Sequence, residues 1–342
     1  MKKFVSFLVI SILIFSMVGC SGGDDEVAEE TGIKERKWKL GHVRPTETST
    51  DEDALRFKKA IAEASGDKIT VEVYPSSQLG DYSVVQERIG MGDIEMQLAP
   101  AGTSVDKALG IASTPYLTGS WEEAKEVYSM DSKLMNAVAD RFSKQGIKLL
   151  APYPKYFGGI ALATEPVSPG DPSVDKGIKI RVPSIKSYEE NAKSLGYIAT
   201  PIAYSEAFTS IQTGIVDGAI GSGAEGYYSS FRDVVDYYLP VKDHFEMWFL
   251  YMSEDVWNGL SQEEKDIVQN AATNLTNGRW ERAEAEEQKA LEKLEEAGIE
   301  VVDISDEQVE AMAAKARENV WPKIKGDYGE ELFDEIVESL GY

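Results

Sequence analysis

Residues 177–183 read Gly-Ile-Lys-Ile-Arg-Val-Pro, and our interpretation of the fold starts from this stretch. Its three apolar side chains alternate with Lys179 and Arg181, which is the two-residue period of a strand with one buried face. Pro183 ends the strand because proline has no amide hydrogen to donate. We therefore expect Arg181 at the carboxyl end of a strand, the edge at which open α/β sheets bind ligands.

The chemistry of Arg181 suggests what it binds there. A guanidinium group can hold a carboxylate through two parallel hydrogen bonds, which an ammonium group does less well. An arginine at the surface, or one in a structural salt bridge, is equally compatible with this pattern in so acidic a chain. The stretch alone leaves these alternatives open.

On either side of this strand, the chain alternates between strand and helix patterns. Strand periodicity recurs at residues 37–43, 68–74, 94–99, 147–151 and 214–220. Helix signals lie between them at residues 49–65, 83–90, 188–195 and 205–212, and the first begins with the capping-box spacing of Ser49 and Glu52. This alternation predicts an α/β fold with covered sheets. Residues 261–297 lack proline and predict long helices, followed by a strand at 298–304 and further helix.

The N-terminus predicts export and a lipid anchor. Two lysines precede an uncharged apolar stretch at residues 4–18, which is too short to span a bilayer but is typical of a secretory signal peptide. Cys20, the single cysteine, follows directly and resembles the lipidated cysteine of a bacterial lipobox. The alternative is an ordinary signal peptide with a chance cysteine. We predict a signal peptide at 1–19, lipidation of Cys20, and a flexible acidic tether at 20–34.

The charge of the chain excludes two classes of partner. Removal of residues 1–19 leaves 33 basic and 59 acidic residues, a net charge of −26. Such a chain does not bind nucleic acid, and it has no basic surface for anionic lipid. We expect the lipid on Cys20 to be its contact with the cell membrane.

No motif points to catalysis, a cofactor or a metal. Residues 221–226, Gly-Ser-Gly-Ala-Glu-Gly, match the dinucleotide fingerprint, but no acidic residue ends a predicted strand about 20 residues later. We interpret them as a turn whose missing side chains allow the backbone to approach a ligand or the opposite domain. His42 and His244 lack ligand-spaced partners, and no Gly-x-Ser-x-Gly motif occurs. We expect no cofactor, no metal and no enzymatic activity.

Four motifs together resemble the substrate-binding subunits of TRAP transporters. They are Pro-Ser-Ser-Gln-Leu-Gly at 75–80, the stretch at 177–183, Ser-Glu at 205–206, and Gln-Thr-Gly-Ile-Val-Asp-Gly at 212–218. The resemblance extends over about residues 37–340. It implies an extracytoplasmic protein that captures a small organic acid, holds the ligand carboxylate with Arg181, and delivers the acid to integral membrane transporter subunits.

The resemblance also implies a domain organisation. It predicts a two-lobed, type II-like periplasmic-binding-protein fold of mixed sheets flanked by helices, with long C-terminal helices crossing both lobes. We place lobe I at 35–156 plus about 246–275, lobe II at 157–245, and the C-terminal helices at 255–342.

The sequence differs from the family pattern at two places in the expected pocket. Residues 156–161, Tyr-Phe-Gly-Gly-Ile-Ala, replace a segment that carries a second arginine in many relatives, and residues 217–221, Asp-Gly-Ala-Ile-Gly, replace a more polar segment. We therefore expect a monocarboxylate with an apolar or amine-bearing body. The aromatic residues Tyr156, Phe157, Tyr227 and Tyr228 could stack on it, or belong to the core. The predicted ligand contacts are Arg181, Tyr156, Phe157, Tyr204, Gly221, Ser222 and Glu225.

Two other functions remain as alternatives to a transport subunit. One is an extracytoplasmic lipoprotein enzyme, a hydrolase acting on a carbohydrate or ester. The other is a binding lobe that reports its ligand to a sensor.

Overall fold

The computed structural model describes residues 32–342, so the predicted signal peptide, Cys20 and most of the predicted tether lie outside the described residues. The strands are β1 (Arg36–Gly41), β2 (Ile69–Tyr74), β3 (Met96–Ala99), β4 (Ile147–Phe157), β5 (Gly159–Leu162), β6 (Lys179–Val182), β7 (Ile198–Pro201), β8 (Gly218–Ser222), β9 (Tyr237–Leu239), β10 (Phe245–Ser253) and β11 (Glu300–Val301).

The helices complete the same alternation. They are α1 (Ser49–Ser65), α2 (Tyr82–Gly90), the 3₁₀ helix η1 (Lys107–Ser113), α3 (Trp121–Val127), α4 (Lys133–Ser143), α5 (Lys186–Ser194), α6 (Tyr204–Gln212), α7 (Ala224–Phe231), α8 (Glu254–Asn258), α9 (Gln262–Glu296), α10 (Asp306–Asn319), α11 (Trp321–Tyr328) and α12 (Glu330–Ser339).

Two mixed sheets organise the described residues. The first sheet has the order β2-β1-β3-β10-β4, and the second has the order β11-β9-β5-β8-β6-β7. In the first sheet β1 runs parallel to β2 and β3, whereas β10 runs antiparallel to β3 and β4. In the second sheet β6 runs parallel to β7 and β8, and β5 is antiparallel to β8 and β9. We call each sheet with its flanking helices a lobe, and the predicted two-lobed α/β fold is confirmed.

Two segments of the chain cross between the lobes, and they lie side by side. The chain passes from β4 to β5 at Gly158 and returns from β9 to β10 through residues 240–244. The Gly158 amide donates a hydrogen bond of 2.8 Å to the carbonyl of His244. A Cβ atom at position 158 would lie 2.2 Å from the imidazole Cε1 of His244, so only glycine allows the two crossings to approach this closely.

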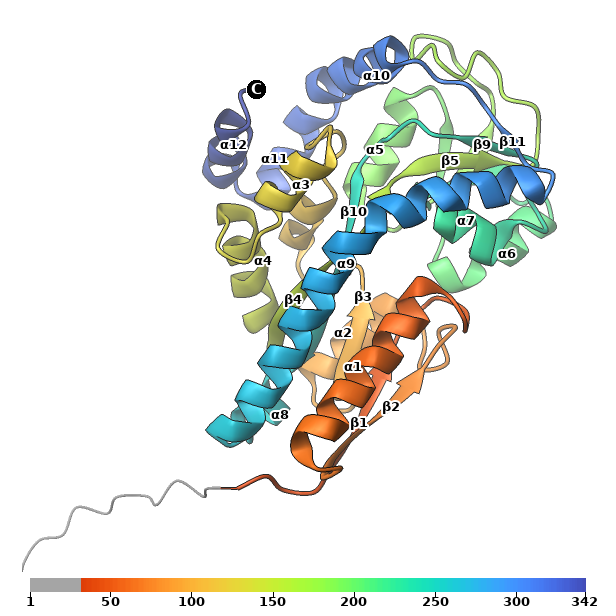
Figure 1. Cartoon of the computed structure of the whole chain (residues 1–342). Helices are drawn as coiled ribbons and strands as arrows, with labels where there is room; N and C mark the ends of the chain where they lie inside the picture. Colours follow the sequence, from red (N-terminus) through yellow and green to blue (C-terminus); the bar gives the residue numbers. More distant parts are fainter. Residues whose placement is uncertain (1–31) are drawn as a thin grey trace, which may run out of the picture. The chain divides into compact units, whose positions relative to one another are not determined.

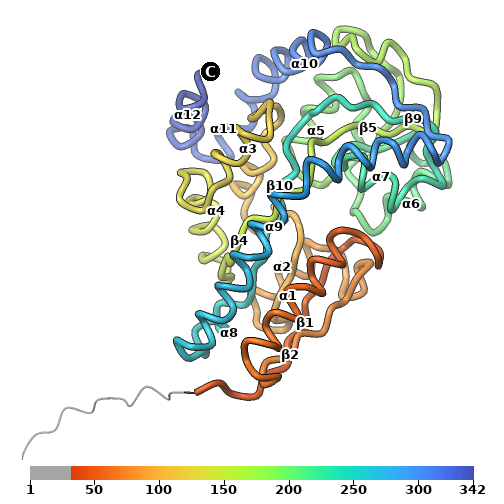
Figure 2. The backbone as a smooth tube through the Cα atoms, in the orientation of Figure 1, coloured from red at the N-terminus to blue at the C-terminus, as the bar shows by residue number. Residues whose placement is uncertain are grey.

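The 35-residue helix α9 is a third connection between the lobes. Its first half buries Val268, Ala272 and Leu275 in the core of the first sheet, and its second half buries Ala290 and Leu294 in the core of the second. The capping box of Ser261 and Glu264 begins the helix. Figure 2 shows the chain then returning through α10, α11 and α12, which pack on α5, η1 and α4.

Several elements differ from the sequence predictions; the strand predicted at 214–220, for example, is β8 at Gly218–Ser222. Helix α1 is capped one residue earlier than expected, because the side chain of Thr48, and not that of Ser49, accepts a hydrogen bond at the helix N-terminus. Strand β4 continues from the predicted end at 151 to Phe157. Strand β11 contains two residues instead of the seven predicted at 298–304, because it pairs only with β9 at the sheet edge.

The extension of β4 has a clear physical reason. Pro152 and Pro154 have no amide hydrogen to donate to a neighbouring strand, so a strand that contains them belongs at a sheet edge. β4 is the edge strand of the first sheet, and its only partner β10 shifts register twice alongside it.

Candidate ligand-binding pocket

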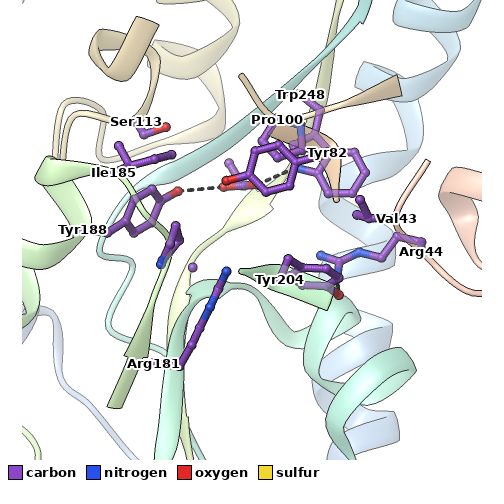
Figure 3. A pocket seen from close by; sticks show the side chains of 13 residues that line it. Val43, Arg44, Tyr82, Pro100, Ser113, Arg181, Ile185, Tyr188, Tyr204 and Trp248 are labelled. Carbon is purple, nitrogen blue, oxygen red and sulfur yellow. Dashed lines mark hydrogen bonds between the residues drawn. The ribbon is translucent and has the colours of Figure 1, made fainter. Parts of the chain in front are cut away.

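A small pocket, with a cavity volume of about 30 Å³, lies between the two lobes. Residues of the first lobe form one side: Val43, Arg44, Tyr82, Pro100, Ser113, Glu246 and Trp248. Residues of the second lobe form the other side: Arg181, Pro183, Ile185, Tyr188, Tyr204 and Gly221. The wall therefore combines aromatic rings with three charged side chains (Figure 3).

Arg181 stands where the sequence places it, at the end of β6 and just before Pro183. It is only 3% exposed, and its side chain points into the pocket (Figure 3). Its Nε donates a hydrogen bond of 2.8 Å to the carbonyl of Ile202, which fixes the orientation of the guanidinium group. Within residues 32–342 no carboxylate lies within 4.0 Å of this group. Burial lowers the pKa of Arg181, yet an arginine stays protonated in proteins.

Arg44 is a second buried guanidinium in the same pocket, and it was not among the predicted ligand contacts. It follows β1 and is 1% exposed. Its Nη1 and Nη2 donate hydrogen bonds to the hydroxyls of Tyr204 and Tyr156, and its Nε lies 3.9 Å from Glu225. Burial acts to lower the pKa of Arg44, but the acidic groups around it raise it above the usual value. Arg44 is therefore engaged within the protein, unlike Arg181.

Glu225 neutralises this side of the pocket from outside the lining. Its carboxylate lies 3.0 Å from Lys155 Nζ and accepts a hydrogen bond of 3.3 Å from Ser49. Burial opposes ionisation, but Lys155 and Arg44 hold the pKa of Glu225 at about 2. For Lys155, burial outweighs Glu225 and lowers the pKa to about 8. We call Arg44, Lys155 and Glu225 the interlobe ion cluster, because Glu225 belongs to α7 and its two cations belong to the first lobe.

A carboxylate, Glu246, is the third charge in the lining. Its Oε2 accepts hydrogen bonds from His244 Nε2 at 2.7 Å and from the Tyr188 hydroxyl at 3.0 Å, and its Oε1 accepts one from Trp248 Nε1. Asp243 lies 2.8 Å from the other ring nitrogen of His244. Burial alone would lower the pKa of His244, but the two carboxylates raise it to about 10. Burial also opposes ionisation of Glu246, yet its pKa stays below the usual value, mainly because of His244.

The other predicted ligand contacts are placed differently. Tyr204 and Gly221 line the pocket, whereas Tyr156 is buried behind it against Arg44. Phe157 packs edge-on against Trp121 and Phe245, with ring centroids 6.0 and 5.1 Å apart. Ser222 is buried in β8 and is absent from the lining, as is Glu225.

Two of the aromatic residues offered as stacking partners also lie elsewhere. Tyr227 belongs to the core of the second lobe, and its hydroxyl donates a hydrogen bond of 2.7 Å to the carbonyl of Ala219. Tyr228 lies against that core and does not line the pocket. The aromatic wall comes instead from Tyr82, Tyr188 and Trp248, together with Tyr204.

The glycines at 221–226 allow the lobes to approach closely. A Cβ atom at Gly223 would lie 2.4 Å from the ring of Tyr156, and one at Gly226 would lie 2.6 Å from Arg44 Nη2. Both neighbours belong to the first lobe, so these positions need glycine for steric reasons. Instead of a turn alone, the segment forms the end of β8 and the start of α7.

The pocket wall is more polar than the sequence suggested. The prediction of a less polar wall rested on residues 156–161 and 217–221, whereas the additional charges come from Arg44 and Glu246. Sequence features could have identified both residues. Arg44 follows a predicted strand at the edge where ligands bind, and Glu246 is the one charge within the apolar run at 245–252.

Two features are absent from residues 32–342. No cluster of three or more histidine, cysteine or acidic side chains there could hold a metal ion. None of the helices in this range is both long enough and apolar enough to cross a bilayer.

The sequence is similar to that of known solute-binding proteins. The sequence model of the bacterial extracellular solute-binding protein family 7, DctP, matches residues 40–326. Solute-binding protein RD1_1052 of Roseobacter denitrificans is 27% identical over 90% of this chain and 91% of its own length. The ectoine-binding periplasmic protein TeaA of Halomonas elongata is 27% identical over 89% of each chain.

A solved structure shares the fold. The sugar acid binding protein DctPAm of Advenella mimigardefordensis, in complex with galactonate, matches with a TM-score of 0.83 and 23% identity, over 90% of this chain and 98% of its own. Because the family model covers well over half of the sequence, the chain belongs to the family 7 solute-binding proteins of TRAP transporters.

Proposed function

We propose that this member of the family binds a small organic monocarboxylate between its lobes and delivers it, chemically unchanged, to integral membrane subunits of a TRAP-type transporter. The observation that carries the proposal is Arg181, a buried guanidinium that points into the pocket and has no carboxylate partner within residues 32–342. An uncompensated buried charge is costly, and a ligand carboxylate removes that cost.

The charges of the lining support a ligand with one negative charge. Arg44 is paired with Glu225, and Glu246 is paired with His244. Arg181 has no carboxylate partner within residues 32–342, so the lining carries one surplus positive charge. A monocarboxylate neutralises this charge, whereas a dicarboxylate brings a second negative charge close to Glu246. Galactonate, the sugar acid bound to DctPAm, is a monocarboxylate with one negative charge.

Calorimetry of the ligand-free protein against a panel of small carboxylic acids tests this function. A bound acid should raise the unfolding free energy by about 2.7 kcal/mol at one hundred times its dissociation constant. Mass spectrometry of the recovered acid should find it unaltered. The proposal fails if no acid binds, and conversion of the acid would favour the hydrolase alternative.

We also propose that Cys20 anchors the protein outside the cell through a lipid. The support is the sequence at residues 1–20 alone, with its apolar stretch and single cysteine. Lipidation with more than one chain holds a protein firmly at a bilayer. Cys20→Ser should therefore move the protein from the membrane fraction to the soluble fraction with ligand affinity unchanged. A variant that still sediments with membranes would contradict the anchor.

A further inference from the structure

We propose that Glu246 forms a second ligand subsite, which accepts a hydrogen bond from a hydroxyl group of the monocarboxylate that Arg181 holds. This inference rests on the proposed function and adds the chemical class of the ligand, a hydroxylated monocarboxylate. It starts from the position of Glu246, a carboxylate 6% exposed that lines the same pocket as Arg181.

The surroundings of Glu246 keep it ionised. His244 lies between Glu246 and Asp243, within 2.8 Å of both carboxylates, and is positively charged in this arrangement. Tyr188 and Trp248 donate to the same carboxylate. An ionised carboxylate can only accept hydrogen bonds, so a ligand group that meets Glu246 must be a donor.

One acceptor position of Glu246 is left for a ligand. Oε2 already accepts from His244 and Tyr188, whereas Oε1 accepts only from Trp248. A carboxylate oxygen has about two acceptor positions. Glu246 lines the pocket, and the second acceptor position of its Oε1 has no partner within residues 32–342.

The charge of the lining selects a hydroxyl over the two other common polar groups. A second carboxylate cannot donate, and it would be repelled by Glu246. An ammonium group can donate, but a ligand with one carboxylate and one ammonium has no net charge and leaves the surplus positive charge of the lining in place. A hydroxyl donates to Glu246 and preserves the single negative charge that Arg181 requires.

Four-carbon acids that differ in one group test the subsite. The probes are butyrate, its 2-, 3- and 4-hydroxy derivatives, 4-aminobutyrate and succinate, each titrated into the wild type and Glu246→Gln. Hydrogen bonds to charged groups are usually worth about 1.5 to 3 kcal/mol, so at least one hydroxybutyrate should bind the wild type about ten to one hundred times more tightly than butyrate. Glu246→Gln should reduce this preference to about threefold or less, and succinate should bind the variant better than the wild type.

Glu287→Gln is the matched control, because Glu287 is a partly buried carboxyl outside the pocket lining. It should retain the wild-type preference for the hydroxylated acid. The subsite is contradicted if Glu246→Gln keeps that preference, or if 4-aminobutyrate binds the wild type more tightly than every hydroxybutyrate. If the wild type binds no acid of the set or of the wider panel, the proposed function fails and the subsite with it. Acids that bind without hydroxyl discrimination overturn the subsite alone.

Discussion

The two buried arginines of the pocket, Arg44 and Arg181, are almost equally hidden but are neutralised in different ways. Arg44 donates to two tyrosine hydroxyls and shares Glu225 with Lys155, so its charge is compensated within the fold. Arg181 donates to one backbone carbonyl and has no carboxylate partner among residues 32–342. The arrangement of Arg44 is typical of a structural ion pair, and that of Arg181 is typical of an anion-binding site.

Glu287 shows why Arg181 is unusual. This α9 carboxyl accepts hydrogen bonds from the amide of Phe157 at 2.9 Å and from Trp121 Nε1 at 3.2 Å, beside the crossing from β4 to β5. Burial raises the pKa of Glu287 to about 7, so it can take up a proton and lose its charge. An arginine cannot lose its charge in this way, so another group must neutralise it.

The largest effect on stability should come from breaking the interlobe ion cluster. Glu225→Gln leaves Arg44 and Lys155 buried without their shared carboxylate, and removal of one partner from a buried pair costs about 3 to 5 kcal/mol. Because the Glu225 side chain is 15% exposed, we expect a loss near 3 kcal/mol in the free energy of unfolding, measured with urea.

A surface glutamate provides the control for that variant. Glu52 pairs with Arg56 at 3.2 Å, and its side chain is 55% exposed. Glu52→Gln should change the free energy of unfolding by about 0.5 kcal/mol or less. Equal losses for both variants would mean that the interlobe ion cluster does not stabilise the fold.

A smaller, pH-dependent effect should come from Glu287. Its pKa rises from 4.5 in the unfolded chain to about 7 in the fold, so between these values the folded state holds a proton that the unfolded state has released. This contribution to stability is present below about pH 4.5 and is lost as the pH rises through 7. The stability of Glu287→Gln relative to the wild type should therefore be about 1 to 3 kcal/mol higher at pH 8.5 than at pH 5.5. A difference independent of pH would contradict the assignment.

Local sequence patterns predicted much of the fold and one side of the pocket. Arg181 was predictable because strand periodicity and Pro183 together fix its place at a sheet edge. Strand β4 was only partly predictable, since Pro152 and Pro154 are tolerated there for a reason that depends on the neighbouring strands.

The roles of Arg44, Glu225 and Glu246 depend on contacts between distant segments. Glu225 and Lys155 are separated by 70 residues, and their pairing arises only when α7 packs against the first lobe. Glu225 was expected in the pocket because it lies in the glycine-rich segment, yet its carboxylate is turned toward Lys155. No local pattern encodes that direction.

Calorimetric titration of Arg181→Ala with the acid that binds the wild type tests the central claim most directly. Loss of one partner from a desolvated charge pair typically costs about 2 to 5 kcal/mol, so affinity should fall roughly thirtyfold to several thousandfold. The affinity of Arg181→Lys should lie between those of the two proteins, because lysine keeps the charge but cannot form two parallel hydrogen bonds with a carboxylate. Ligand-free Arg181→Ala should melt near the ligand-free wild type, since Arg181 has no ion pair to lose within the described fold. Binding within about threefold of the wild type would contradict the assignment of Arg181 as the ligand anchor.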